Sequence, residues 1–342
     1  MRAVVVHEFA RPASVEVVDD PGCPPDGVVV AVAATGLCRS DWHAWVGHEP
    51  DIPLPHVPGH ELAGTVAEVG PDVTGWRVGD RVTTPFVLAC GACRSCARGD
   101  QQVCERQLQP GFTQWGSFAE LVALPRADVN LVRIPDEVSA DVAAGLGCRF
   151  GTAYRAVAQV ADVRAGETVV VHGCGGVGLS VVMVALARGA RVLGVDVAPE
   201  SLALVAELGG EPVPADEVGS LVDLTGGGAD ASLDALGSTA TFANSLACLR
   251  PRGRHVQVGL LLGEHATPAV AMGDVVAREL QVLGSHGMSA AAYPELLALV
   301  TDGTLAPQRL VTGTIGLDEA PARLADLGRP GSGAGGITVI RP

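Results

Sequence analysis

The first part of the chain, up to about residue 135, consists of short apolar runs broken by glycine and proline. Apolar positions with a long helical period are missing there. The pattern predicts an irregular antiparallel β structure, in which a functional site would be built on loops. Its β-type runs are MRAVVVHEFA (1–10), VVVAVAATGLC (28–38), ELAGTVAEVG (61–70), GDRVTTPFVL (79–88) and SFAELVALP (117–125).

After Ser139 the pattern changes to buried strands that alternate with helices. Alternation at this spacing predicts a parallel, doubly wound sheet. The helical stretches include PESLALVAELG (199–209) and TATFANSLACL (239–249). The expected strands are ETVVVHG (167–173), ARVLGVDV (190–197), DASLDALG (230–237), GRHVQVGLL (253–261) and LQVLGSHG (280–287).

These two patterns predict an α/β protein of two domains. The 342 residues exceed the length at which a single hydrophobic core keeps growing. We expect a β-rich domain over residues 1–149 and a doubly wound domain over 150–287. Residues 288–342 are expected to return to the first domain, with a helix in AAYPELLALVTDG (291–303) and a strand in GITVIRP (336–342).

Composition narrows the range of functions. Hydrophobic residues make up 48% and charged residues 18% of the chain, as in a compact globular protein. The net charge is −15 and lysine is absent, which argues against nucleic acid as a partner, against a P-loop and against Schiff-base chemistry. The uncharged stretch 169–187 contains four glycines and a histidine, so it is a strand, turn and helix and no membrane span. The N-terminus carries no export signal, and we expect a cytoplasmic protein.

Four cysteines occur within the fifteen residues CGACRSCARGDQQVC. In a reducing compartment such a cluster usually binds metal, and disulfides between such close neighbours would be strained. Four thiolates leave no open coordination position, which is typical of structural zinc. An Fe–S cluster or a redox switch is the alternative. The predicted ligands, in a lobe over about residues 88–106, are Cys90, Cys93, Cys96 and Cys104, and Arg94, Arg98 and Gly99 are expected to supply positive charge and turn geometry.

The string VVVHGCGGVGLS has glycines in G-x-G-x-x-G spacing between an expected strand and an expected helix. That context is what a dinucleotide site requires, because the glycines allow a tight turn and the helix N-terminus faces the pyrophosphate. Asp196, at the end of the next strand, is placed to bind the adenosine ribose. The expected cofactor contacts are Gly173, Gly175, Gly176, Val177, Gly178, Asp196 and Val258.

A second metal set is predicted in the β-rich domain. Cys38, His60 and Cys148 together offer two thiolates and an imidazole. Three protein ligands with an open fourth position are the arrangement of catalytic zinc.

The strings CRSDWH (38–43), GHELAGTVAEVG (59–70) and GDRV (79–82), with the cysteine lobe and the glycine loop in this order, make the whole chain resemble one family. It is similar to the zinc-dependent alcohol dehydrogenases of the medium-chain dehydrogenase/reductase family. The resemblance implies a GroES-like catalytic domain, a Rossmann domain, and two zinc ions per chain, one catalytic and one structural. It also implies that Glu61 approaches the catalytic metal and exchanges with its water, and that Asp41 orients the histidine ligand.

The same resemblance assigns a proton path. Ser40 takes the alcohol proton, His43 passes it to solvent through the nicotinamide ribose, and Arg39 contacts the pyrophosphate. The chain departs from many members at Arg149, which follows Cys148 and could bias substrate specificity. Cys23, Cys174 and Cys248 receive no role.

We therefore expect reversible hydride transfer between NAD and an uncharged primary or secondary alcohol, with its aldehyde or ketone. Phe86, Trp42 and Trp115 are candidates for an apolar substrate cleft. NAD is expected over NADP because Asp196 would repel a 2′-phosphate and no basic residue lies between Val197 and Glu207.

Alternatives and assembly complete the expectations. A polyol or amino-alcohol dehydrogenase of the same family is the first alternative, and a non-catalytic zinc-containing nucleotide sensor is the second. A homo-tetramer or dimer is expected, because family members pair the edge strands of their nucleotide domains, and GRHVQVGLLLG (253–263) is apolar enough to be that edge.

Overall fold

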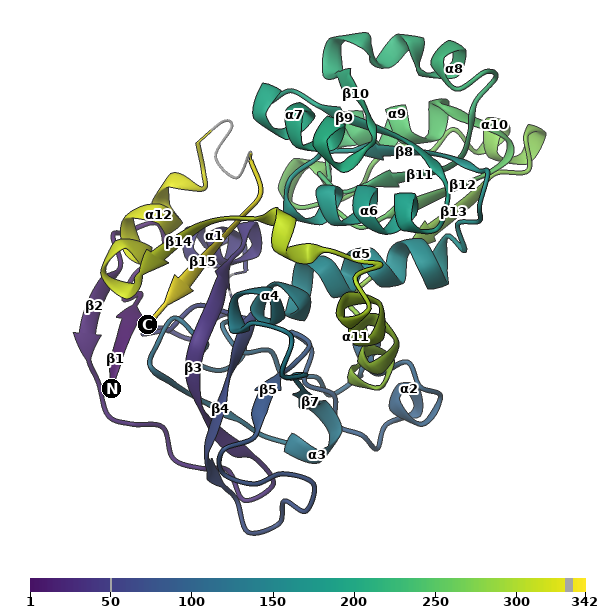
Figure 1. The fold of residues 1–342 in the computed structure, drawn as a ribbon. Helices are drawn as coiled ribbons and strands as arrows, with labels where there is room; N and C mark the ends of the chain where they lie inside the picture. Colours follow the sequence, from purple (N-terminus) through teal and green to yellow (C-terminus); the bar gives the residue numbers. More distant parts are fainter. Residues whose placement is uncertain (50, 330–334) are drawn as a thin grey trace. The chain divides into compact units, whose positions relative to one another are not determined.

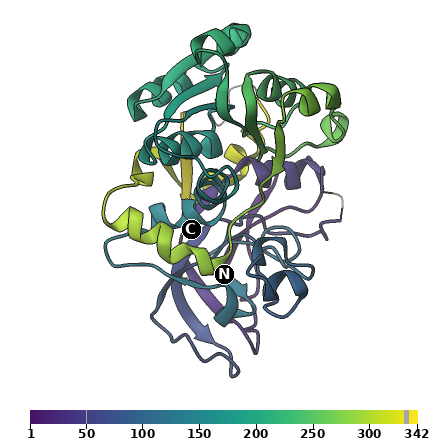
Figure 2. The same ribbon diagram turned by 90° about the vertical axis from the view of Figure 1, so that its right-hand side faces the viewer.

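The computed structural model of the chain describes residues 1–49, 51–329 and 335–342. The chain forms two compact units. The first contains Met1–Gly151 and most of the chain from Gly287 onward, including Ile337–Pro342, and the second contains Thr152–His286. Both chain ends belong to the first unit, as Figure 1 and the quarter turn in Figure 2 show. Within the described residues, each helix is too short or too polar to cross a membrane.

The first unit is built on a seven-stranded sheet in which only β14 and β15 pair in parallel. The strand order is β14-β15-β3-β4-β5-β7, and β6 pairs with β3 outside this path. The strands are β3 (Val28–Leu37), β4 (Leu62–Val69), β5 (Arg81–Thr83), β6 (Leu121–Leu124), β7 (Val132–Arg133), β14 (Val311–Gly316) and β15 (Ile337–Arg341). A separate antiparallel pair consists of β1 (Arg2–Val5) and β2 (Ser14–Val17).

Helices of the first unit are short and connect or flank these strands (Figure 1). They are α1 (Arg39–Val46), α2 (Arg94–Ala97), α3 (Ala127–Asn130), α4 (Ala140–Gly145), α11 (Tyr293–Thr301) and α12 (Ala320–Asp326). A π-helical turn, Leu146–Phe150, continues α4, and α5 (Gly151–Arg155) follows it toward the second unit.

Strand register brings distant segments of the first unit together. Thr35 of β3 pairs with Leu62 of β4 in an antiparallel ladder, so the end of β3 lies beside the start of β4. The residues just after β3 and just before β4 therefore meet at one end of the sheet. Helix α4 packs on both strands and leads directly into the π-helical turn at that end.

The second unit is a six-stranded, fully parallel sheet with the order β10-β9-β8-β11-β12-β13. This is the doubly wound Rossmann order, which reverses between β8 and β11. Its strands are β8 (Thr168–His172), β9 (Arg191–Asp196), β10 (Glu211–Pro214), β11 (Ala229–Asp234), β12 (Leu249–Gln257) and β13 (Gln281–Gly284). Its helices are α6 (Gly176–Ala187), α7 (Pro199–Leu208), α8 (Leu221–Leu224), α9 (Thr239–Ala247) and α10 (Met272–Ala277). The predicted fold class is confirmed.

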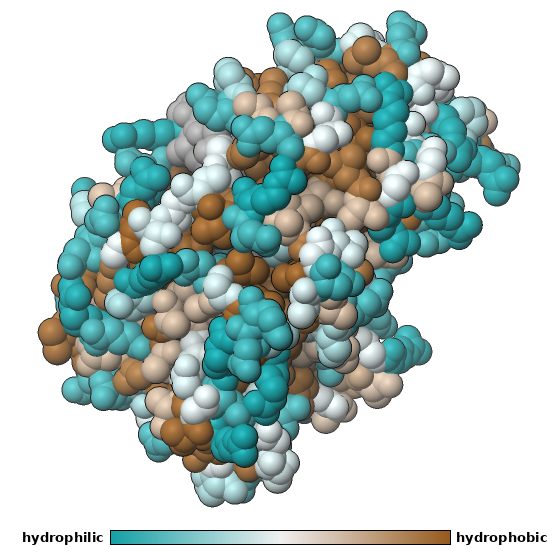
Figure 3. Space-filling model, in the orientation of Figure 1, coloured by the Kyte–Doolittle hydropathy of each residue, from teal (hydrophilic) through white to brown (hydrophobic). Residues whose placement is uncertain are grey.

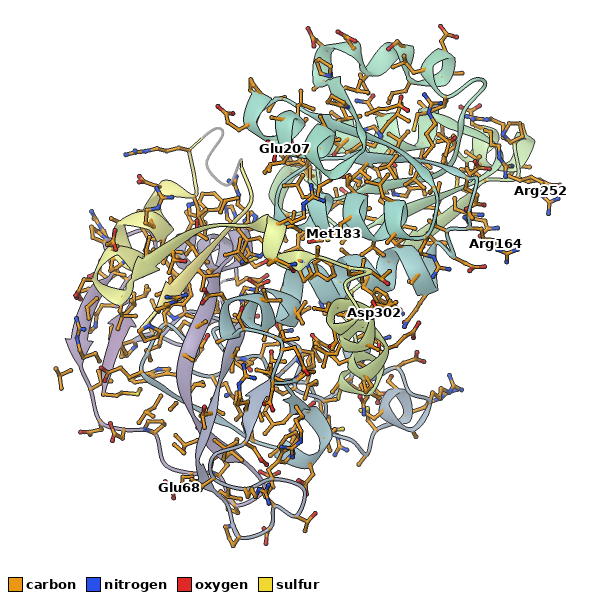
Figure 4. The ribbon with its side chains drawn as sticks, viewed as in Figure 1. Glu68, Arg164, Met183, Glu207, Arg252 and Asp302 are labelled. Atoms are coloured by element: carbon orange, nitrogen blue, oxygen red, sulfur yellow. The ribbon has the colours of Figure 1, made fainter. Side chains whose placement is uncertain are left out.

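Helix α6 explains the long uncharged stretch noted in the sequence. Val169, Val170 and Val171 of β8 are fully buried, and α6 is buried along most of its length. Even Met183, labelled in Figure 4, is only 7% exposed. A strand and a helix that are buried on nearly all sides give a continuous apolar run without any lipid contact.

The expected edge strand of the second unit is wrong. Residues 253–257 belong to β12, which pairs with β11 on one side and with β13 on the other. The described edges are β13 and β10. Apolar side chains do reach the surface near β13, since Met272, Val276 and Val282 are 57%, 73% and 42% exposed. Figure 3 shows hydrophobic residues lying between hydrophilic ones on one face of the molecule.

A buried polar network links the strands of the second unit. Ser232 Oγ lies 2.7 Å from Ser245 Oγ, which lies 2.7 Å from His255 Nδ1. The Cys248 thiol donates to Ser232 Oγ at 3.5 Å and lies 3.8 Å from His172 Nε2. Burial lowers the pKa of His172 and of His255 to about 4. Cys248, which had no role in the sequence, is thus a packing residue of this network.

These two histidines make acid stability a testable property. Below about pH 6.5 His172 and His255 bind protons in the unfolded chain but stay neutral in the folded protein. The free energy of unfolding therefore decreases as the pH falls from about 6.5 to about 4. Each histidine accounts for roughly 3 kcal/mol over that window. We expect the melting temperature to fall over this pH range, and to fall less steeply in a His255→Gln variant. An unchanged slope in that variant would contradict the assignment.

Candidate metal and nucleotide sites

The four cysteines of the lobe converge on one point. Their sulfur atoms all lie within 4.8 Å of one another. Cys93 Sγ is 3.4 Å from Cys96 Sγ and 3.8 Å from Cys104 Sγ, and Cys90 Sγ is 4.0 Å from Cys96 Sγ. These separations are too long for disulfide bonds and suit four thiolates around one ion.

Backbone amides surround the sulfur atoms of the lobe. The N–H groups of Ala92 and Cys93 donate to Cys90 Sγ at 3.5 and 3.3 Å. Such donors favour the thiolate, and with the Ala92 amide as the main cause they lower the pKa of Cys90 to about 6. Burial has the opposite effect at Cys96, whose pKa it raises to about 12, so the thiolate is favoured at Cys90 but not throughout the lobe.

A different arginine from those expected approaches the lobe. Arg94 and Arg98 are exposed, whereas Arg106 donates from Nη2 to Cys90 Sγ at 3.4 Å. Gly99 does supply turn geometry, with a φ of 88°. Arg106 follows the last ligand, Cys104, by two residues and lies in a turn. The spacing of the cysteines alone does not reveal its contact with Cys90.

The second group of ligands is assembled by strand register. The ligand atoms of Cys38, His60 and Cys148 lie within 4.8 Å of one another. Cys38 follows β3, His60 precedes β4, and Cys148 lies on the π-helical turn. Turns of this kind interrupt a helix and occur frequently at functional sites.

Asp41 determines how His60 is presented. Its Oδ1 lies 2.9 Å from His60 Nδ1 and its Oδ2 accepts the Cys38 N–H at 2.9 Å, and Asp41 is completely buried. A proton on Nδ1 leaves the lone pair of Nε2 free, and this buried Nε2 has no hydrogen-bond partner. An unpartnered imidazole nitrogen beside two cysteine sulfurs fits zinc.

Of the two sulfur ligands Cys38 favours the thiolate, whereas Cys38 raises the pKa of Cys148 well above its ordinary value. Its neighbour Cys148 lowers the pKa of Cys38 well below the ordinary value, against the effect of burial, and His60 and Arg149 lower it further. Gly59 allows the segment that carries His60 to lie close against Phe118. Its φ is 104°, and a Cβ there would lie 2.5 Å from the Phe118 ring.

Glu61 and Arg149 form a buried ion pair beside these ligands. Arg149 Nε lies 3.1 and 3.0 Å from the two carboxylate oxygens, Nη2 also donates to Oε2, and the Arg149 backbone N–H donates to Oε1 at 2.8 Å. Burial raises the pKa of Glu61, and the Arg149 guanidinium opposes that rise. The Arg149 guanidinium is buried and paired with Glu61, so, contrary to the expectation from the sequence, it is not available to bias substrate choice.

The expected proton path lies on helix α1. Ser40 Oγ is 3.9 Å from Cys38 Sγ. His43 Nδ1 lies 2.8 Å from His48 Nδ1, a partner that the sequence analysis missed. Burial, followed by His48 and Arg39, lowers the pKa of His43 to about 4, so its imidazole is neutral at pH 7 and would pass a proton on without keeping it. That this path carries the alcohol proton remains a prediction.

Arg39 has contacts of its own within the first unit. Its guanidinium lies 4.8 Å from the centre of the Trp42 ring, and Nη1 donates to the Leu327 carbonyl. A contact with a pyrophosphate remains a prediction.

Two phenylalanines flank the histidine ligand. The ring centroids of Phe86 and Phe112 lie 6.3 and 5.4 Å from that of His60. Phe112 was not among the expected cleft residues. Trp42 packs against Gly328, where a Cβ would come within 2.6 Å of its Nε1, and Trp115 donates to the Pro55 carbonyl at 3.1 Å.

The glycine loop of the second unit follows β8 and opens α6. Gly173 has a φ of 84°, and a Cβ on Gly178 would lie 1.8 Å from the Gly173 carbonyl oxygen. A Cβ on Gly175 would meet no atom within 4 Å, which leaves space for a ligand. No side chain caps the start of α6 at Gly175, so the amides of Gly176 and Val177 belong to an uncapped first turn that favours an anion.

Asp196 ends β9 beside this loop. Its Oδ2 accepts the Cys174 N–H at 2.6 Å and its Oδ1 accepts the Ala198 N–H at 2.8 Å, so the carboxylate is fixed. Val258 follows β12, and its N–H donates to the Asp234 carbonyl at 3.0 Å. Asp234 ends β11 as Asp196 ends β9, and the sequence analysis did not single it out. Its Oδ1 accepts the N–H groups of Leu236 and Gly237 at 2.9 and 3.0 Å.

Comparison with known proteins agrees with this geometry. Residues 24–136 match the alcohol dehydrogenase GroES-like domain, and residues 176–302 match the zinc-binding dehydrogenase domain. An alcohol dehydrogenase of Geobacillus stearothermophilus is 35% identical over 309 residues, which cover 89% of this chain and 90% of that protein. An NAD-dependent alcohol dehydrogenase of Sulfolobus acidocaldarius is 32% identical and covers 96% of both chains.

Solved structures and a relative of different activity complete the comparison. The alcohol dehydrogenase TADH from Thermus sp. ATN1 is 32% identical with a TM-score of 0.90, over 100% of this chain and 99% of that one. An acryloyl-coenzyme A reductase of Metallosphaera sedula is 31% identical over 93% of this chain and 94% of that protein. The chain belongs to the zinc-binding alcohol dehydrogenases of the medium-chain dehydrogenase/reductase family.

Proposed function

We propose that this protein oxidises an uncharged primary or secondary alcohol reversibly to its carbonyl compound with NAD, at a zinc ion held by Cys38, His60 and Cys148. The observation that carries the proposal is the buried His60 Nε2, which has no hydrogen-bond partner and lies with the sulfur atoms of Cys38 and Cys148 in one group. A zinc ion held there would supply Lewis acidity that lowers the pKa of a bound alcohol.

The chain's own residues support the remaining steps. Asp41 keeps the His60 proton on Nδ1, so the metal-binding nitrogen stays available. Ser40 Oγ lies 3.9 Å from Cys38 Sγ and would accept a hydrogen bond from the alcohol, and the neutral His43 on the same helix would relay the proton to solvent without keeping it. Gly175 and the uncapped start of α6 would bind the pyrophosphate, and Asp196 would bind the adenosine ribose of NAD.

An acyl-coenzyme A ester is a less suitable substrate than an alcohol. The ligand set of Cys38, His60 and Cys148 would offer an ion to a hydroxyl oxygen, which an acyl thioester lacks. A polyol or amino-alcohol dehydrogenase is the alternative, and Cys148 counts against it, because relatives of that kind often carry an acid in the region of the third ligand.

Metal analysis and an alcohol screen test the proposal together. Protein purified without chelator should contain two zinc ions per chain, one for each group of ligands. Nicotinamide absorbance should report turnover with several neutral alcohols and NAD, and removal of the ions should abolish it. A folded protein with one zinc or none, or turnover that is indifferent to chelation, would contradict the assignment.

We also propose that the protein assembles into a homo-oligomer, with β13 in place of β12 as the pairing edge. The support is that β13 ends the sheet and that apolar side chains near it, such as Val276, are exposed.

A further inference from the structure

One side chain joins all three segments that carry the ligands of the three-ligand group. Arg149 directly follows the ligand Cys148, Glu61 directly follows His60, and Leu37 directly precedes Cys38. The Arg149 guanidinium contacts both oxygens of Glu61 and donates from Nη1 to the Leu37 carbonyl at 3.1 Å. The three partners are therefore each one residue away from a different ligand.

The contact is enclosed and bidentate. The Glu61 side chain is completely buried, and that of Arg149 is 7% exposed. Two parallel hydrogen bonds from a planar guanidinium fix distance and orientation, which a lysine ammonium cannot do. The Arg149 backbone N–H adds a further bond to Glu61 Oε1 at 2.8 Å, so the π-helical turn itself is tied to the segment of His60.

Space for the pair is reserved by the backbone of β3. A Cβ on Gly36 would lie 2.1 Å from Glu61 Oε2 and 2.6 Å from Arg149 Nη2. The Gly36 N–H also donates to the Glu61 carbonyl at 2.7 Å. Any side chain at position 36 would push the pair apart without changing a ligand or a charge.

Charge requires a cation at this place. Two thiolates and the Glu61 carboxylate would concentrate negative charge in a buried volume, where an unpaired charge is costly. Arg149 is the cation that the structure places there, and both carboxylate oxygens of Glu61 are occupied by it.

We propose that Arg149 is a positioning residue that, through Glu61 and the Leu37 carbonyl, fixes the three metal-binding segments and so sets the metal affinity of the Cys38, His60 and Cys148 site. The inference deepens the proposed function and rests on metal binding at that site, but not on the alcohol or on NAD. Partners one step behind metal ligands commonly change metal affinity by about 10- to 100-fold.

The test measures metal affinity and not turnover alone. Cobalt or zinc is titrated into the purified full-length protein in competition with a chromophoric chelator, and the cobalt absorption bands report the geometry at the site. In Arg149→Met we expect affinity at the three-ligand site to fall at least about tenfold, with altered cobalt bands, while the four-cysteine site is unchanged. Arg149→Lys should recover only part of the affinity, because it restores the charge without the fork.

A matched control comes from another arginine–carboxylate pair in the same unit. Arg133 donates to both oxygens of Asp80 at 2.8 and 3.2 Å, and neither residue adjoins a ligand. Arg133→Met should leave both metal affinities unchanged. If Arg149→Met does not fold, Gly36→Ala and Arg149→Lys decide the question, since both keep every ligand.

Three results would overturn the proposal. The first is a loss of thermal stability in Arg149→Met, or in the two substitute variants, while the metal affinity of the three-ligand site stays within twofold of the parent and the cobalt absorption bands are unchanged. The second is equal weakening of both metal sites, which would indicate general loosening. The third is full affinity in Arg149→Lys alongside weak binding in Arg149→Met, which would leave charge alone responsible. A parent protein that binds metal here but oxidises no alcohol would contradict the proposed function and leave this inference standing.

Discussion

In the Cys148→Ala variant we expect alcohol turnover to fall by about a thousandfold or more, while the protein keeps its fold. The loss of one sulfur opens the coordination of the three-ligand site, and the several kcal/mol of transition-state stabilisation that a Lewis acid supplies correspond to a factor of this size. Cys148 lies on a turn that is anchored independently, because the Tyr293 hydroxyl donates to the Leu146 carbonyl at 2.9 Å. Turnover numbers and far-UV circular dichroism check the two halves of this expectation.

The Cys96→Ala variant is the matched comparison. Cys96 is one of the four sulfur ligands of the lobe, which we expect to fold around its ion. The melting temperature should therefore fall more in Cys96→Ala than in Cys148→Ala. Turnover per folded molecule should remain measurable. Equal effects of the two substitutions on turnover and on stability would refute the division into a catalytic and a structural ion.

The second large effect concerns cofactor choice. We expect kcat/KM with NAD to exceed that with NADP by about 100-fold or more, because a like-charge contact in the site costs a few kcal/mol. The Asp196 carboxylate cannot swing away from a 2′-phosphate, since backbone N–H groups hold both of its oxygens. Glu207, labelled in Figure 4, lies in the last turn of α7 and not at the strand end that carries Asp196.

Replacement of Asp196 by serine together with Val197→Arg should narrow or reverse this preference. Val197 is 81% exposed, so an arginine there can be accommodated without repacking. Glu200→Gln serves as the control, because it removes a negative charge from the first turn of α7 and leaves Asp196 in place. Little change in the preference for NAD over NADP is expected in this variant. Similar kcat/KM values for the two cofactors in the unmodified enzyme would show that Asp196 does not face the ribose.

Local sequence patterns were enough for the fold class and for the cysteine lobe, whereas Cys38, His60 and Cys148 lie far apart in the chain and were grouped from their residue types and the family resemblance. The cysteine lobe is contained within fifteen residues, and the glycine loop lies directly between β8 and α6, so short-range spacing carries the information. Strand β10 was missed because it contains Pro212 and Pro214, which a sheet tolerates at its edge.

Errors arose where tertiary neighbours decide the outcome. The segment 253–263 was interpreted as an edge from its apolar residues, but most of these lie after β12, and β12 itself is paired on both sides. The partnership of Glu61 with Arg149 joins residues that are 88 positions apart, and no local pattern encodes it. The same holds for Arg106, which contacts the sulfur of Cys90 from 16 positions further along the chain.

The return of the chain to the first unit has a consequence for biosynthesis. Strand β15, at the end of the chain, pairs with β3, and Thr338 lies opposite Leu37, the residue before Cys38. During synthesis the ligands of the lobe leave the ribosome almost together, and Thr152–His286 emerges as one continuous segment, so both are able to fold early. The sheet that supports Cys38 and His60 lacks β14 and β15 until residues 311–341 are made. The lobe is therefore expected to acquire its ion earlier in synthesis than the three-ligand site, which waits for the strands that complete its sheet.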